Sequence, residues 1–302
     1  MLAFVDKMCY NEQKAPEEVP MLQGLAIWHY PHRTIAENVR FFAAYGLDSV
    51  SVHGSQFARA ITDPVTAEDI ACAVSDTGVV FTVHGCLPRH HTPEAVEIFE
   101  TELELWARWQ DAHGLISVLS FDVPQTIREG QGIGGYLRRV LDAVPQCKVA
   151  VEDFGLTARE VEQISFLKGN ERFGYLVDLG HLFLRMKGLN TGGKVLFTNS
   201  SYEHPPVRCP DATHFYSALA AKEFPIFEMH LHNNDGVSDL HWFLEEGSLD
   251  VPAVARAIRE LDFQGILTVE SAPGFRFECR GADADEGIRK TLDYWKVCLE
   301  EA

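Results

Sequence analysis

The chain has 302 residues, a formal net charge of −18 at pH 7, 46% hydrophobic residues and 23% charged residues, a composition typical of a folded domain with a large core. The acidity disfavours nucleic acid as a partner, because proteins that bind duplexes usually present a basic face to the phosphates. No apolar run approaches the roughly 20 residues of a membrane span, and the seven cysteines include no Cys-x-x-Cys pair, so we expect no membrane contact, no disulfide scaffold and a cytoplasmic location.

Short apolar, β-branched runs alternate with helical hydrophobic patterns along almost the whole chain. In chain order, the predicted strands cover residues 23–29, 48–54, 79–85, 115–123, 148–155, 173–181, 225–235 and 265–271. Helical patterns lie between and after them, at residues 35–46, 66–78, 93–114, 133–145, 157–169, 249–265 and 284–302. The expected helix C-caps are Gly46, Gly78, Gly114 and Gly265.

This strict alternation predicts parallel strands joined by right-handed crossovers. Eight units close naturally into one (β/α)8 TIM barrel, so we expect a single domain over residues 1–302 with an N-terminal extension at 1–22. The rhythm breaks at residues 188–211, a long loop after the sixth strand, which in a barrel lies on the active face and is typical of a lid or binding loop. The alternative, an open doubly wound sheet, usually carries a phosphate-binding loop near its start, and this sequence has none there.

Each predicted strand ends in an ionisable or metal-binding residue. These are His29, His53, His84, Asp122, Glu152, Asp178, His230 and Glu270. They follow apolar runs that should bury them, and a buried charge is costly unless it is paired or bound to a metal. One histidine at a strand end is more often a hydrogen-bonded core residue, but a complete ring at one barrel mouth favours a metal site.

The last four strands contribute three carboxylates and one imidazole, from Glu152, Asp178, His230 and Glu270. Carboxylate oxygen together with imidazole nitrogen suits Mn²⁺, Co²⁺, Mg²⁺ or Zn²⁺, so we expect one such divalent metal there. Two short spacings, Asp178-x-x-His181 and Asp239-x-His241, add further ligands or substrate contacts.

The segment EMHLHNNDGVSDLHWFLEEGSLDVPAVARAI, together with VAVEDFG, YLVDLGH and ILTVES, resembles the xylose isomerase-like TIM barrel superfamily. The resemblance extends from about residue 23 to the end of the chain, and the two short spacings are its most specific parts. This superfamily contains sugar and sugar-phosphate isomerases and epimerases, and also zinc-dependent apurinic/apyrimidinic (AP) endonucleases of family 2.

The resemblance implies roles for individual residues. The epimerase-like members bind a single divalent metal at the positions of Glu152, Asp178, His230 and Glu270. Their two glutamates, here Glu152 and Glu270, face opposite sides of the substrate carbon, and His181 falls where they place a substrate-contacting histidine. The endonuclease-like members hold three zinc ions, and the matching positions, a possible second metal site or substrate site, are His84, His181, Asp239 and His241. That pattern also expects a histidine where Asp122 ends the fourth strand, so more than one zinc ion requires Asp122 to substitute for it.

These observations favour a metal-dependent sugar or sugar-phosphate isomerase or epimerase. Glu152 and Glu270 are the expected base and acid of a proton transfer through an enediolate that the metal stabilises. His181 and Arg276 are expected to bind the substrate, Arg276 through a phosphate or carboxylate. The aromatic residues expected to wall the pocket are Trp28, Phe57 and Trp242.

Three alternatives remain open. A polyol dehydratase would use the same residues, and a zinc phosphodiesterase acting on abasic DNA would use the additional ligands. A barrel that binds a carbohydrate without converting it is disfavoured, because binding alone does not require paired glutamates at a metal. The sequence pattern does not identify the substrate, because specificity in this fold depends on the shape of the loops. It is also compatible with a homo-oligomer.

Overall fold

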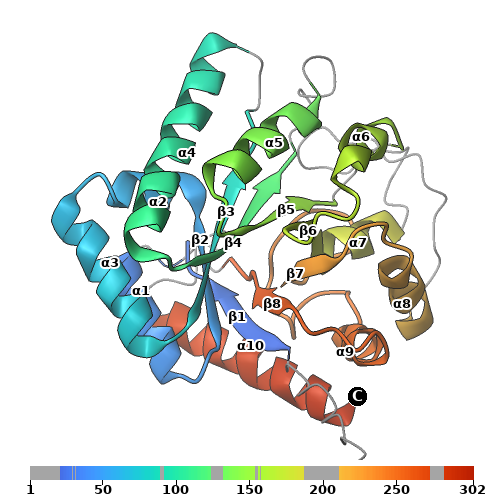
Figure 1. Ribbon diagram of the computed structural model, residues 1–302. Coiled ribbons are helices and arrows are strands. Elements are labelled where there is room, and N and C mark those ends of the chain that lie inside the picture. Colours follow the sequence, from blue (N-terminus) through green and yellow to red (C-terminus); the bar gives the residue numbers. More distant parts are fainter. Residues whose placement is uncertain are drawn as a thin grey trace, which may run out of the picture.

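The computed structural model describes residues 21–28, 30, 32–88, 92–123, 132–153, 156, 158–186, 211–272 and 282–302. Within these residues, parallel strands form a closed barrel in which each strand pairs with its chain neighbours and β1 pairs with β8 (Figure 1). The strands are β1 (Leu22–Ala26), β2 (Ser49–His53), β3 (Val80–Cys86), β4 (Ile116–Asp122), β5 (Lys148–Glu152), β6 (Phe173–Asp178), β7 (Ile226–Leu231) and β8 (Ile266–Val269). The predicted (β/α)8 barrel is confirmed, and the open sheet is excluded.

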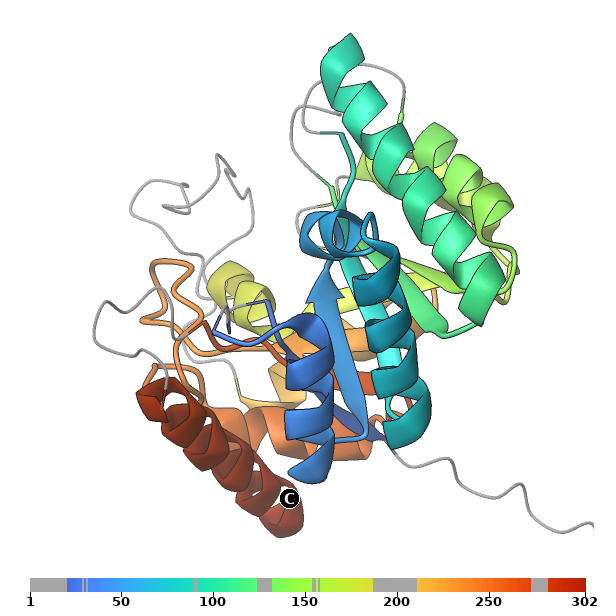
Figure 2. The same cartoon turned by 90° about the vertical axis from the view of Figure 1, so that its left-hand side faces the viewer.

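Helices surround the barrel on its outside (Figure 2). They are α1 (Ile35–Ala44), α2 (Gly54–Ala60), α3 (Pro64–Thr77), α4 (Pro93–His113), α5 (Ile133–Ala143), α6 (Ala158–Ile164) with the 3-10 turn η2 (Ser165–Leu167), α7 (Leu179–Met186), α8 (Ala212–Ala220), α9 (Val251–Glu260) and α10 (Ala282–Glu301). Across the described ranges, every helix is too short or too polar to cross a bilayer.

Helix α7 begins directly where β6 ends, so the strand predicted over residues 173–181 stops at Asp178. The reason is local: the Asp178 carboxylate accepts a hydrogen bond from the backbone N–H of His181 at 2.7 Å, which satisfies a donor of the first helical turn. His181 is therefore carried by a helix rather than by a strand. Helix α2 likewise starts at the end of β2, where no helix was predicted.

Two predicted C-caps, Gly78 and Gly114, adopt the left-handed conformation at the ends of α3 and α4. The cap predicted at Gly265 is wrong. Helix α9 ends at Glu260, and the left-handed residue after it is Asp262, with φ 52°. Gly265 instead allows a close approach to β7, because a Cβ there would lie 2.6 Å from the Phe227 carbonyl oxygen.

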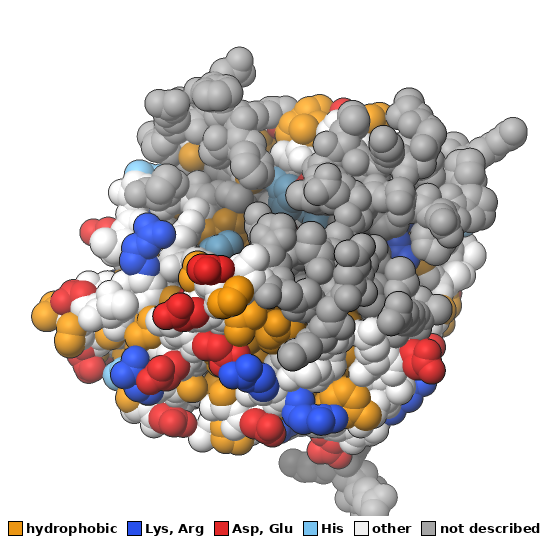
Figure 3. Space-filling view, turned by 90° about the horizontal axis from the view of Figure 1, so that it is seen from above, with side chains coloured by type: hydrophobic (Ala, Val, Ile, Leu, Met, Phe, Trp, Pro, Cys, Tyr) orange, Lys and Arg blue, Asp and Glu red, His pale blue; other side chains and the backbone are white. Residues whose placement is uncertain are grey.

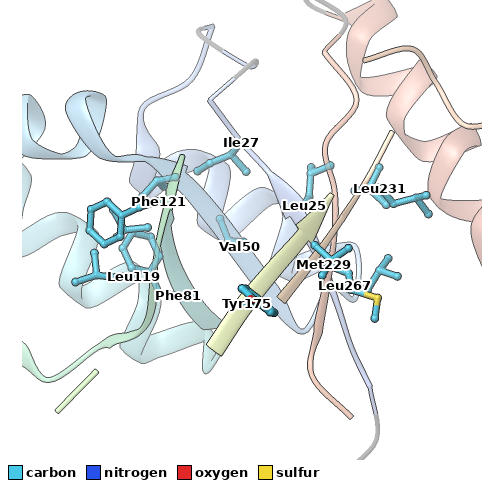
Figure 4. Close-up of a cluster of buried hydrophobic side chains, with 14 of the residues drawn as sticks. Leu25, Ile27, Val50, Phe81, Leu119, Phe121, Tyr175, Met229, Leu231 and Leu267 are labelled. Atoms are coloured by element: carbon cyan, nitrogen blue, oxygen red, sulfur yellow. The ribbon is translucent and has the colours of Figure 1, made fainter. Parts of the chain in front are cut away.

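Alternate strand side chains face the helices and the barrel axis. The outward set is apolar and packs beneath the helices (Figure 4); it includes Phe81, Leu119, Tyr175, Met229 and Leu267. The intervening set is buried and mixed: it includes the apolar Val118, Ala150, Leu176 and Ile266 and the polar Thr82, Ser120, Glu228 and Thr268. The barrel interior thus carries hydrogen-bonding groups directly below the carboxyl ends of the strands.

An ion pair ties α10 to the segment before α1. Arg33 Nη1 donates to Asp285 Oδ1 at 2.8 Å, and Nη2 bonds to Oδ2. These Arg33 hydrogen bonds and the arginine charge lower the pKa of Asp285, against the burial that would raise it. A carboxyl group whose pKa is lowered on folding stabilises the protein above its unfolded-state pKa, and this contribution disappears as the pH falls through the folded-state pKa.

We therefore expect Asp285→Asn to cost about 1 kcal/mol at pH 7, or about 2–4 °C in Tm. The Tm difference from the parent protein should narrow as the pH falls below about 4. Thermal unfolding followed by circular dichroism between pH 7 and pH 3 measures both effects. A difference that stays constant over this range would show that the carboxylate charge contributes nothing.

Candidate metal centre

The carboxyl ends of the strands meet at one face of the barrel. Seen from above, histidine side chains lie at the centre of this face (Figure 3). The register explains the gathering, because Asp178 of β6 is the direct partner of His230 on β7, and His53 of β2 is the partner of His84 on β3. The parallel pairing of the strands therefore places the predicted strand-end residues side by side at this face.

Asp178, His230 and Glu270 form one buried group, whose ligand atoms all lie within 4.8 Å of one another. His230 Nδ1 lies 3.0 Å from Glu270 Oε2. Among the described residues, Asp178 Oδ2 is buried and has no hydrogen bond. A buried carboxylate oxygen without a partner is costly, so this donor set fits a divalent cation.

Glu152 joins the same centre from the side of β5. Together with Asp178 and His181 it forms a second group of closely spaced ligand atoms. His181 Nδ1 lies 2.8 Å from Glu152 Oε1 and 3.7 Å from Asp178 Oδ2. Since Asp178 belongs to both groups, the structure brings the four predicted ligands of the first metal together around this one aspartate.

His84 lies apart from the rest of the predicted outer set and forms a third group with Asp122 and Glu152. Its Nε2 is 3.1 Å from Asp122 Oδ1, and its Nδ1 is 3.0 Å from Ser120 Oγ. The Asp122 side chain, 45% exposed, thus stands beside His84 at the end of β4. This is the position at which the endonuclease-like pattern expects a histidine.

The other outer residues, His181, Asp239 and His241, form a fourth group with His232. Sequence reasoning missed His232, although its signal was present. Residues two apart on a strand share a face, so the run His230-x-His232 at the end of β7 directs both imidazoles into the barrel.

The same period of two places Glu228 below His230, and this residue was missed as well. Glu228 is fully buried, and its Oε1 accepts hydrogen bonds from the hydroxyl groups of Thr82 at 3.2 Å and Thr268 at 2.9 Å. His230 Nε2 lies 3.4 Å from the same oxygen. Burial raises the pKa of Glu228, but the hydrogen bond and charge of His230 outweigh it and lower the pKa. An ionised Glu228 therefore holds His230 in a fixed ring orientation, with Nδ1 toward Glu270.

We expect Glu228→Gln to weaken the affinity of the centre for divalent metal by about 10–100-fold, the usual range for a group that orients a metal-binding histidine. A competition titration against a metallochromic chelator measures the affinity. Glu97→Gln, on the exposed face of α4, makes the same change away from the centre and is the matched control. An unchanged affinity for Glu228→Gln would show that Glu228 supports only the barrel interior.

The two predicted catalytic glutamates have opposite electrostatic surroundings. Burial and the neighbouring Asp122 carboxylate raise the pKa of Glu152 to about 8. Burial also acts on Glu270, but the charges of His241 and His230 outweigh it and lower its pKa to about 2. Burial lowers the pKa of His181, yet nearby carboxylates, Asp178 first, raise it well above 6.5. The centre therefore has a negative field that stabilises positive charge.

Trp28 forms one wall of the centre. Its ring stacks on His84 with a centroid distance of 5.8 Å and lies 6.1 Å from His230. His53 meets Trp28 edge to face at 6.3 Å and belongs to none of the ligand groups found in the described part of the chain.

The prediction that Phe57 walls the pocket is wrong. Helix α2 turns its side chain outward, where it is fully buried against Phe81 at 5.4 Å and Trp109 at 5.1 Å. The partly buried Trp242 lies in the loop after β7, where its backbone pairs with Asn233. His29, Arg276, residues 1–20 of the N-terminal extension and residues 188–210 of the loop lie outside the described residues.

Comparisons with known proteins agree with this architecture. The solved structures of similar fold include the IOLI protein with a bound zinc atom (TM-score 0.65, 14% identity, 93% of this chain and 99% of that one). They also include a 3-keto-D-glucoside 4-epimerase from E. coli (TM-score 0.62, 15% identity, 92% and 100%) and a D-psicose 3-epimerase from Clostridium cellulolyticum H10 (TM-score 0.61, 10% identity, 92% and 99%).

At these identities the likeness shows the fold alone, and no curated protein sequence matches the chain. A family model described as the xylose isomerase-like TIM barrel, however, matches residues 39–298. That span covers most of the chain and all of the ligand groups. The chain therefore belongs to the xylose isomerase-like TIM-barrel family.

Proposed function

We propose that this protein is a divalent-metal-dependent isomerase or epimerase of a small sugar or sugar phosphate. The observation that carries the proposal is the placement of two buried glutamates, Glu152 on β5 and Glu270 just after β8, in two ligand groups that share Asp178. Two such glutamates can remove a proton from one face of a substrate carbon and return a proton to the other face. A site that only bound a carbohydrate would have no need of them.

In this proposal one glutamate takes the proton from the carbon next to the substrate carbonyl, and the other returns a proton to the opposite face. A bound divalent ion supplies Lewis-acid stabilisation of the developing oxygen charge. His181 fixes the orientation of the Glu152 carboxyl through the 2.8 Å contact, and Trp28 shields the His84 and His230 side of the centre from water.

The related folds support this class of reaction. Two of the similar structures are named as epimerases of keto sugars, and another is described as a probable dehydratase. Proton removal beside a carbonyl begins both kinds of reaction. The experiment must therefore identify the substrate and distinguish an isomerised product from a dehydrated one.

The test incubates the metal-loaded protein in D2O with a panel of ketoses and ketose phosphates, followed by NMR. We expect exchange of the proton next to the carbonyl for deuterium and formation of an epimer or an aldose–ketose isomer with the atoms of the substrate apart from that deuterium. A product lighter by one water would assign a dehydratase instead. Exchange at the parent rate by a protein that lacks both glutamates would overturn the proposed mechanism.

A zinc phosphodiesterase acting on abasic DNA is the second candidate. The group of His84, Asp122 and Glu152 favours it, because Asp122 stands where that class of enzyme has a histidine ligand. Incubation of the zinc-loaded protein with a duplex that contains one abasic site tests it. Strand cleavage that Glu152→Gln abolishes would support this candidate, and an intact duplex would remove it.

A further inference from the structure

A mostly buried ion pair lies next to Glu152, on the far side of strand β5 from the barrel mouth. Neighbouring residues of a strand point to opposite faces, so Glu152 faces the mouth and Asp153 turns outward. There the Asp153 carboxylate pairs with the ammonium group of Lys222, which belongs to the segment between α8 and β7. The Asp153 side chain is 12% exposed and the Lys222 side chain 14%. The proposed reaction gives this pair no role.

The backbone of Asp153 is held by two further elements. Its N–H donates to the Leu176 carbonyl oxygen of β6 at 2.9 Å, and its carbonyl oxygen accepts a hydrogen bond from Arg185 Nη1 of α7 at 3.0 Å. With Lys222, three different parts of the chain therefore hold the residue that follows Glu152. Because the peptide group between the two residues is planar and rigid, this anchoring restricts the direction in which the Glu152 side chain leaves the strand.

A small cavity adjoins both the ion pair and the metal centre. Its volume is about 10 Å³, which is room for about one water molecule. Its lining includes Asp153, Lys222 and Asp178, the aspartate that two ligand groups share. A shorter side chain in place of Lys222 would enlarge this cavity beside Asp178, whereas methionine has nearly the length of lysine and removes only the charge.

We propose that Lys222 is a positioning residue for Glu152: its ion pair with Asp153 fixes the end of β5 and thereby the place of the Glu152 carboxylate in the metal centre. An exposed ion pair contributes little, but breaking a buried one is costly because the remaining charge loses its partner. The ammonium group therefore holds Asp153 in one place. Lys222 acts through Glu152 and needs no contact with substrate. The inference rests on the proposed function only in taking the centre as a divalent-metal site.

The alternative is that His181 alone sets the position of Glu152. His181 Nδ1 lies 2.8 Å from Glu152 Oε1, and Lys222 would then only stabilise the barrel wall. The two arrangements differ in how two substitutions combine. If Lys222 acts through Glu152, its replacement matters only while the Glu152 carboxylate is present. A contribution to the whole barrel would have the same effect with or without that carboxylate.

The experiment is a double-substitution cycle on the full chain, with Co²⁺ affinity measured by competition against a metallochromic chelator. The affinity followed is that of the ion whose binding Glu152→Gln weakens. Lys222→Met should weaken it by about 10-fold, the lower end of the range for partners of metal-binding residues. The same change in a Glu152→Gln protein should alter it by less than about 2-fold.

Lys168→Met is the matched control. It breaks the ion pair with Glu223, the residue next to Lys222, in which the ammonium nitrogen and carboxylate oxygen lie 2.8 Å apart but the side chains are 55% and 50% exposed. This variant should keep the parent affinity. Should Lys222→Met fail to fold, Asp153→Asn combined with Lys222→Met leaves no buried charge unpaired and is measured in its place, with the same expected result. Circular dichroism of the metal-free variants verifies their fold.

Loss of affinity by the same factor with and without the Glu152 carboxylate would overturn the proposal and make Lys222 a residue of the barrel wall. Parent affinity in a folded Lys222→Met would contradict it too, as would a Glu152→Gln protein that binds every ion as the parent does. No readout needs a substrate. A protein that binds metal but converts no sugar would refute the isomerase proposal and leave this result standing, and an additive cycle would refute this inference alone.

Discussion

Replacing Glu152 or Glu270 by Gln is expected to slow proton exchange next to the substrate carbonyl by about 10²–10⁴-fold, the usual contribution of one general acid or base. An amide has nearly the shape of the carboxylate but cannot accept the proton. Both side chains are buried at the centre, so bulk water has little access to replace them. Incorporation of deuterium from D2O at the reacting carbon gives the rate directly.

Both glutamates also belong to ligand groups, so the metal must be controlled in this comparison. Rates are to be compared at saturating metal and with metal content measured for each variant. Glu97→Gln, on the exposed face of α4, is the matched control and should exchange at the parent rate. If Glu152→Gln or Glu270→Gln holds metal and catalyses proton exchange as fast as the parent protein, the replaced glutamate does not transfer the proton.

Removing the bound divalent ions is expected to abolish turnover and to lower Tm by roughly 10 °C. An ion present at about 1,000 times its Kd stabilises the folded state by about 4 kcal/mol, and each kcal/mol shifts Tm by about 2–4 °C in a protein of this size class. Without the ions, the partners of the two buried carboxylates among the described residues include the His232 ring and the His181 backbone N–H for Asp178, and the His230 ring for Glu270. Differential scanning calorimetry before and after chelation measures the change.

The control for this experiment is the same chelator saturated beforehand with Mn²⁺. Readdition of Mn²⁺, Co²⁺ or Zn²⁺ to the stripped protein should restore both Tm and turnover, and the order of recovery identifies the preferred ion. Turnover and Tm that persist after the metal content falls to zero would contradict a metal-dependent centre.

The barrel could be predicted because the patterns that specify its strands and helices each lie within a short segment of sequence. Each strand is an apolar run and each helix has its own hydrophobic period, and their strict alternation leaves few topologies. The gathering of Glu152, Asp178, His230 and Glu270 followed for the same reason, since the carboxyl ends of parallel strands share one face. No knowledge of side-chain contacts was needed for that step.

The division of the ring into separate groups could not be predicted, because it depends on contacts between distant segments. His84 pairs with Asp122 of the neighbouring strand, while His181 is moved by α7 toward Asp239. His232 was missed, although it lies two residues after His230 in the same predicted strand, because the pattern assigned one site residue to the end of each strand. Phe57 was misplaced because the short helix α2 is too brief to leave a clear hydrophobic period.

The closure of the barrel by the pairing of β1 with β8 has a consequence for the order of events in folding. Each ligand group draws on only two or three neighbouring strands between β3 and β8. The donors of one group can therefore come together before β1 pairs with β8, because neighbouring strands need only short stretches of intervening chain to be ordered. Metal binding during refolding thus reports the assembly of those neighbouring strands, and the closing pairing of β1 with β8 is a separate event.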